Sequence, residues 1–235
     1  MPVTGRHLAV FLSVSLLASS LAGGAGASTP EALSRGFFRV VFGLEYDGNH
    51  ADAHRVKKYV DPVRFHVTNL SSRDRRAAVA AFLGDLPVRI RNLRASVVQD
   101  EQEANFRVLL VDRRNFGTIV ASQMRADAVA MGARCLVGVR TQNGRIVAST
   151  AIIVADDDDL FRRCLVEEVL QGLGPMNDDE RLGESVFNDT SKHAEFTPFD
   201  QALLNMLYHP AIRPGMTGSE VQRALPFVMR DLGYR

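Results

Sequence analysis

Five side chains that could do chemistry lie close together between residues 167 and 178. Glu167 and Glu168 are adjacent carboxylates, and Gln171, Asn177 and Asp178 follow within the next ten residues. Two neighbouring carboxylates can raise one another's pKa and share a proton, so this pair could take part in acid–base chemistry. Amide and carboxylate oxygens suit Ca²⁺ or Mg²⁺ better than zinc, although neutral amides bind such ions weakly.

A helix predicted over residues 160–173 must position these groups. Its apolar side chains cover one broad arc at 100° per residue, namely Phe161, Leu165, Val166, Val169, Leu170 and Leu173. Arg163, Glu167, Glu168 and Gln171 lie on the other side. This pattern fits a surface helix with a solvated polar face and an Arg163–Glu167 ion pair, and it fits equally a helix whose polar face lines a cleft.

The same segment has the frame H-E-x-x-H-x-x-G-x-x-H-D of the metzincin zinc peptidases, with every histidine replaced. Glu168 stands at the glutamate of that frame, which makes it the candidate catalytic residue. Gly174 stands at the glycine where the helix must turn. Glu167, Gln171 and Asn177 stand where the three zinc ligands would be, and Asp178 follows them. With these positions in the same order, the chain resembles the metzincin superfamily.

The resemblance continues after the helix. Phe187, in the segment 185–189, stands where these peptidases have a methionine in a tight turn, and residues 197–208 resemble their C-terminal helix. The chain resembles more closely an uncharacterised proteobacterial family of secreted proteins and predicted lipoproteins. Members share the E-E-x-x-Q-x-L-G-x-x-N-D core, the S-x-F-N-D segment and an LY-P…PGM tail, here Leu207 to Met216.

The resemblance implies an α/β (α+β) protein with a metzincin-like zincin fold, a twisted mixed sheet and a mostly helical C-terminal part. It implies structural roles for Gly174, Phe187, Asn188 and Asp189, and Asn188 is expected to satisfy backbone groups in a tight turn. Zinc lowers the pKa of bound water from about 15.7 to about 7. Glu168 acting alone as a base cannot replace this activation of water by a metal ion. We therefore expect no metal, no cofactor and no ordinary zinc hydrolysis.

The rest of the chain alternates strands and helices early and is helical late. We predict helices at 31–45 and 73–86, the second capped by Ser72. We predict strands at 63–67, 105–111, 136–140 and 146–154, and a short strand around Val97. Asn143-Gly144 is the strongest hairpin signal. The acidic run 156–159 is expected to cap the next helix, which we favour over a calcium site because its spacing matches no EF-hand loop.

Residues 1–27 are predicted to be a signal peptide cleaved near Ala27-Ser28, which implies a periplasmic or secreted protein. Residues 28–235 would then form a single domain with no integral membrane segment. Its basic and acidic residues balance, which argues against a nucleic-acid partner. Cys135 and Cys164 are expected to form a disulfide in that compartment, and two separate buried thiols are the alternative. His50, His54, His66, His193 and His209 are expected in surface or packing roles.

Three functions remain compatible with the sequence. The first, which we favour, is a non-catalytic domain that binds an extended peptide or envelope protein along a cleft edge, for which strand addition needs no metal. The second is a hydrolase with a carboxylate-based or atypical metal site that uses Glu167, Glu168 and Gln171. The third is a structural envelope protein, in which the polar stripe of the helix would face solvent.

Overall fold

The computed structural model describes Met1 and residues 28–43, 52–124, 132–188, 190 and 193–234. The predicted signal peptide, Asp189 and His50 therefore lie outside the described residues. The elements are α1 (Pro30–Val41), β1 (Val63–Asn69), α2 (Arg76–Arg89), β2 (Ala95–Val97), η1 (Glu101–Glu103), β3 (Phe106–Val111), η2 (Arg113–Asn115), α3 (Phe116–Met124), β4 (Leu136–Gln142), β5 (Arg145–Val154), α4 (Asp158–Gln171), α5 (Pro198–Tyr208) and α6 (Gly218–Leu232). The described part is thus a mixed α/β protein, as the sequence predicts, and it contains six α-helices.

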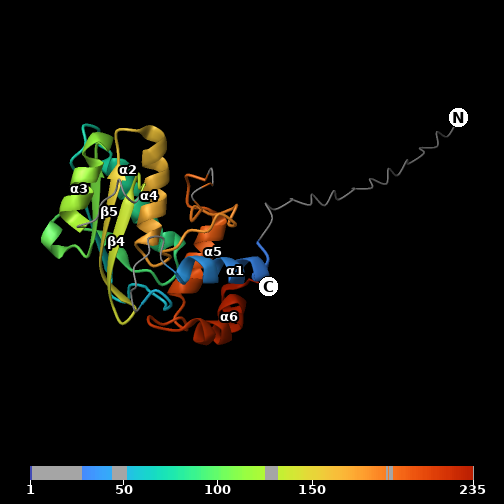
Figure 1. The fold of residues 1–235 in the computed structure, drawn as a ribbon. Helices are drawn as coiled ribbons and strands as arrows, with labels where there is room; N and C mark the ends of the chain where they lie inside the picture. The colour runs from blue at the N-terminus through green and yellow to red at the C-terminus, as the bar shows by residue number, and fades with distance from the viewer. Residues whose placement is uncertain (2–27, 44–51, 125–131, 189, 191–192, 235) are drawn as a thin grey trace.

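One five-stranded sheet carries the order β2-β1-β3-β5-β4 (Figure 1). Its strands pair in parallel except for β4, which runs antiparallel to β5 at one edge. The hairpin between β4 and β5 turns at Asn143 and Gly144, whose φ angles of 52° and 78° are those of a type I′ turn. The Asn-Gly hairpin prediction is therefore confirmed.

Alternate residues of the central strands face two separate hydrophobic clusters. Val108, Leu110 and Ile153 belong to the large cluster, which also contains apolar residues of α1, α2, α4, α5 and α6. Leu109 and Ile152, on the other face, pack with Phe116 and Val120 of α3. In Figure 1, α3 accordingly covers one face of the sheet and α4 the other, while α1, α5 and α6 gather beyond one end.

Side-chain caps fix the N-termini of the two helices α4 and α5. The side chain of Asp157 accepts hydrogen bonds from the backbone N–H groups of Asp159 and Leu160, so the acidic run caps α4 as predicted. Thr197 and Asp200 form a reciprocal capping box at the start of α5. Among the described residues, no helix is long and apolar enough to cross a membrane.

One helix prediction was incomplete, and one helix was not predicted. The helix predicted at 73–86 is α2, which begins at Arg76 and extends to Arg89 through Pro87. Ser72 does not cap it, because the Ser72 backbone N–H and hydroxyl donate to Asp112 instead, at 2.8 and 3.0 Å. The helix α3 was not predicted from the sequence.

Cys135 and Cys164 form a disulfide, with Cα atoms 5.9 Å apart. Cys135 immediately precedes β4, and Cys164 lies within α4. The bond therefore ties the antiparallel edge strand to the helix that carries the candidate site, and the alternative of two separate thiols is wrong.

Candidate functional site

The polar side of α4 is buried. Glu167, Glu168 and Gln171 expose only 6, 5 and 2 % of their surface. The prediction of a surface helix with a solvated polar face is thus wrong for these three residues, because segments distant in sequence cover them. The predicted ion pair is present, with Arg163 Nε 3.3 Å from Glu167 Oε2. A second nitrogen of Arg163, Nη2, donates to the backbone oxygen of Asn188 at 3.3 Å.

Gln171 and Asp178 are joined directly. The Gln171 amide nitrogen donates to both carboxylate oxygens of Asp178, at 3.0 and 3.1 Å. This contact links the end of α4 to the segment that follows the turn. Because both bonds are donated by the amide nitrogen, Gln171 has a structural role here: it connects the end of α4 to Asp178.

Asn177 is held on the other side of the same segment. Its side-chain nitrogen donates to the carbonyl oxygen of Arg39 at 2.8 Å, and its backbone N–H donates to the carbonyl oxygen of Val40 at 3.2 Å. Both acceptors lie in the last turn of α1, where carbonyl groups lack intrahelical partners. Gln171 and Asn177 thus bind different parts of the chain: Gln171 binds Asp178, and Asn177 binds the end of α1.

The turn after α4 depends on Gly174. Its φ of 142° lies in the region that favours glycine, and a Cβ there would lie 2.3 Å from the backbone oxygen of Lys57. Any side chain at this position would therefore displace the segment 56–59 that packs beneath the turn.

A second turn, at residues 185–188, is anchored by Asp200. The Asp200 carboxylate accepts hydrogen bonds from the Ser185 hydroxyl at 2.6 Å and the Val186 backbone N–H at 3.3 Å. Burial raises the pKa of Asp200, and these bonds oppose that rise. Phe187 in this turn is fully buried in the main core.

Asn188 satisfies backbone groups, as the sequence analysis predicted. Its side-chain nitrogen donates to the carbonyl oxygens of Glu180 and Leu182 at 3.1 and 3.2 Å. Its side-chain oxygen accepts the backbone N–H of Thr190 at 2.8 Å. The neighbouring Asp189 lies outside the described residues.

Two buried lysines beneath the site were missed by the sequence analysis. Lys57 Nζ lies 3.2–3.4 Å from five carbonyl oxygens, those of Val41, Gly43, Asp52, Ala53 and Arg55. Lys58 Nζ donates to Leu207 and Ile212 carbonyl oxygens at 2.8 and 2.6 Å. Burial lowers the pKa of each lysine to about 8. No local signal could have identified them, because two consecutive lysines ordinarily indicate an exposed segment.

These lysines connect helix ends that the sequence keeps far apart. Lys57 binds the C-terminal end of α1, and Lys58 binds the C-terminal end of α5. A cation at this end of a helix also interacts favourably with the helix dipole. The pair therefore positions α1 and α5 against the turn at Gly174.

The donor set does not fit zinc. Zinc sites use imidazole nitrogen, thiolate sulfur and carboxylate oxygen. Glu167, Gln171 and Asn177 instead offer one carboxylate and two amides. Both amide nitrogens are already engaged, by Asp178 and by the Arg39 carbonyl. Within the described residues, no group of three or more His, Cys, Asp and Glu side chains is arranged to hold a metal ion.

The described histidines lie in surface or packing positions, as expected. His54 and His193 are exposed, and His66 is half-buried. His209 is buried, and its Nε2 lies 3.1 Å from a carboxylate oxygen of Asp231.

The fold and the site define a mixed α/β domain in which an amide–carboxylate network occupies the end of a core helix. A family model described as "Protein of unknown function (DUF2927)" matches residues 30–227. The chain therefore belongs to this family. No match was found among curated proteins or among solved structures.

Proposed function

We propose that this protein is an exported, non-catalytic binding domain with a metzincin-like fold. The edge strand β4 would hold an extended peptide or an envelope protein by strand addition. The observation that carries this proposal is the position of β4: it pairs with β5 on one side, and no strand of the described chain pairs with its other side. A free strand edge supplies a row of backbone donors and acceptors for an incoming peptide.

The edge is regular and firmly held over five residues. Leu136 to Arg140 pair with β5 in continuous register, and an irregularity follows between Arg140 and Thr141. The disulfide at Cys135 fixes the start of the strand to α4. A preorganised edge loses less conformational entropy when a peptide is added to it.

The metzincin-like character of the fold is supported by the order of its parts. The antiparallel edge strand β4 is followed by β5, and β5 leads directly into α4 with the H-E-x-x-H-like frame. In the metzincin peptidases that the chain resembles, the substrate cleft borders the edge strand. The bonds from Gln171 to Asp178 and from Asn177 to α1 then hold together the parts that a metal would otherwise join.

The proposal is tested by selecting binders from a displayed library of random 12-residue peptides and replacing each backbone N–H of a selected peptide by N-methyl in turn. Strand addition predicts that methylation at every second position abolishes binding, because alternate N–H groups face the edge. Hydrogen exchange should slow at β4 amides and remain unchanged at β2. Binding without this alternation, or protection away from β4, would contradict the proposal.

The burial of two adjacent carboxylates, Glu167 and Glu168, favours one alternative function. In this alternative, the pair acts as a carboxylate-based hydrolytic site. Incubation of the selected peptides with wild-type protein and with Glu168→Gln separates the two functions. Intact peptides in both samples support binding alone, and cleavage that Glu168→Gln abolishes supports the hydrolase.

A further inference from the structure

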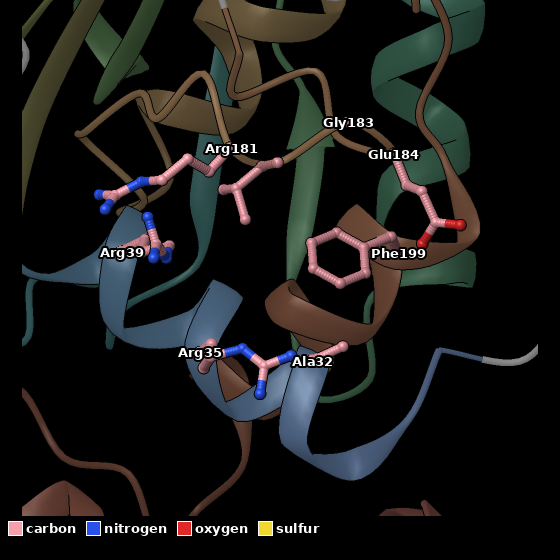
Figure 2. A pocket seen from close by; sticks show the side chains of 8 residues that line it. Ala32, Arg35, Arg39, Arg181, Gly183, Glu184 and Phe199 are labelled. Atoms are coloured by element: carbon pink, nitrogen blue, oxygen red, sulfur yellow. The ribbon is translucent and has the colours of Figure 1, made fainter.

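A cavity of about 370 Å³ opens between α1, the turn 181–184 and the start of α5 (Figure 2). Its lining combines three arginines with apolar side chains, namely Arg35, Arg39, Arg181, Leu182 and Phe199, and one carboxylate, Glu184. Leu182 and Phe199 are buried and form an apolar wall. Since β4 contributes no residue to the lining, this cavity is separate from the strand edge, and a ligand could bind here whether or not a peptide is added to β4.

The three arginines come from two elements. Arg35 and Arg39 lie four residues apart, on one side of α1, and Arg181 comes from the turn above them (Figure 2). Residues four apart on a helix are neighbours on its surface. The helix and the turn thus both contribute arginines to the lining of one cavity.

Asp179 fixes two of these guanidinium groups at the cavity. Its carboxylate is 2.5 Å from Arg39 Nη1 and 2.5 Å from Arg181 Nη2, and its side chain is 9 % exposed. The hydrogen bonds from Arg181 and Arg39 hold the pKa of Asp179 well below its usual range, against the effect of burial. Asp179 therefore stays ionised and preorganises two cations whose remaining N–H groups are available to a ligand.

The cavity retains excess positive charge. Three guanidinium groups are opposed by two carboxylates, those of Asp179 and Glu184. Arg35 is exposed and has no ion pair within the described residues, while Glu184 accepts a hydrogen bond from the Ser28 hydroxyl at 3.2 Å. One guanidinium beside an apolar wall is thus left for an anionic partner, and a planar carboxylate matches its paired N–H groups.

We propose that this cavity binds a carboxylate of a peptide, with an adjacent apolar side chain packed on Phe199 and Leu182. Two sources share this chemistry, a peptide C-terminus and an acidic side chain. Arg35 and the free N–H groups of Arg39 and Arg181 would contact the carboxylate oxygens. Burial of the neighbouring apolar side chain would add specificity, because a small inorganic anion cannot use the apolar wall.

The test is an NMR titration of the full chain with four ligands. Two are acids: acetyl-Gly-Leu, which has a free C-terminal carboxylate, and acetyl-Glu-Leu-amide, which has an acidic side chain. The two controls are the neutral acetyl-Gly-Leu-amide and inorganic phosphate. At least one of the two acids should bind, which identifies the source, while the neutral amide and phosphate bind more weakly. Arg35→Gln should weaken acid binding about tenfold, as loss of one charged hydrogen bond predicts. Arg91→Gln, an exposed arginine outside the cavity, should leave it unchanged.

Any of three results would overturn the proposal. These are binding of neither acid, binding of the neutral amide or phosphate as tightly as the acids, and unchanged acid binding by Arg35→Gln. Thermal unfolding of each variant shows that it is folded, and the exposed position of Arg35 predicts an unchanged melting temperature.

Discussion

The side-chain nitrogen of Gln171 lies 3.0 and 3.1 Å from the two carboxylate oxygens of Asp178. This contact closes the turn after α4 through side chains. Gln171 is only 2 % exposed and Asp178 is half-buried, so the bond is partly shielded from water. A buried hydrogen bond to a charged acceptor stabilises more than one between neutral groups.

Substitution of Gln171 tests the contribution of this bond to stability. Gln171→Ala should lower the free energy of unfolding by about 1–3 kcal/mol, because it leaves the partner carboxylate without its buried donor. Urea denaturation measures the change. Gln102→Ala is the matched control, since Gln102 is exposed in η1 and its loss should cost less than about 0.5 kcal/mol. A wild-type midpoint for Gln171→Ala would show that the bond contributes nothing.

The disulfide should contribute strongly to stability. It closes a loop of 29 residues, for which the chain-entropy model gives about 3–4 kcal/mol. The double variant Cys135→Ser/Cys164→Ser should therefore unfold at lower denaturant concentration. Dithiothreitol should shift the wild type to the same midpoint and leave the variant unchanged. A wild-type midpoint that is the same with and without reductant would contradict the prediction.

The buried lysines should make stability depend on pH. The pKa of Lys57 and Lys58 falls from 10.5 to about 8 on folding, so the unfolded chain binds more protons between these values. The free energy of unfolding should therefore rise from pH 8 to 10, by about 2 kcal/mol per lysine, and this gain is lost as pH falls through 8. Burial raises the pKa of Tyr59 and Tyr208, which reverses the trend above pH 10.

The pH effect can be assigned to single residues. Lys58→Met should roughly halve the rise in unfolding free energy between pH 8 and 10, because Lys57 alone then titrates. NMR of protein labelled with ¹⁵N-lysine side chains should show two ammonium groups that titrate near pH 8. A flat stability profile in wild type, or lysines that all titrate near 10.5, would refute the assignment.

Export makes a further prediction about the mature chain. If residues 1–27 are a signal peptide, protein isolated from its native compartment should begin at Ser28. The Ser28 hydroxyl already lies 3.2 Å from Glu184, so the new α-ammonium group would arise close to that carboxylate. Intact-mass spectrometry measures whether residues 1–27 are absent from the isolated protein. A mass that includes them would contradict the predicted cleavage.

Local chemistry predicted the parts of the fold that depend on few neighbours. The Asn143-Gly144 turn, the acidic cap of α4 and the cysteine pair follow from residue types and their spacing. The start of α2 could not be predicted, because Asp112, forty residues away, binds Ser72 and removes it from the cap position. Helix α3 escaped prediction because its sequence FGTIVASQM is rich in residues of weak helix propensity, and it is stabilised by packing on the sheet.

The sequence placed Glu167, Glu168 and Gln171 on one side of the helix but did not predict their environment. Helical periodicity could not distinguish a solvated polar face from a buried one, and the burial of Glu167 and Glu168 comes from tertiary contacts. This burial disfavours the purely structural alternative, which required the stripe to face solvent. The carbonyl cage of Lys57 likewise forms only when the end of α1 and residues 52–55 come together.

We propose that side-chain amides and carboxylates, and no metal ion, hold this site together. Elemental analysis of untagged protein, purified from its native compartment without chelator, tests the claim most directly. We predict far less than one equivalent of any transition metal per chain. One tightly held equivalent, released by Gln171→Ala or Glu167→Ala, would contradict it.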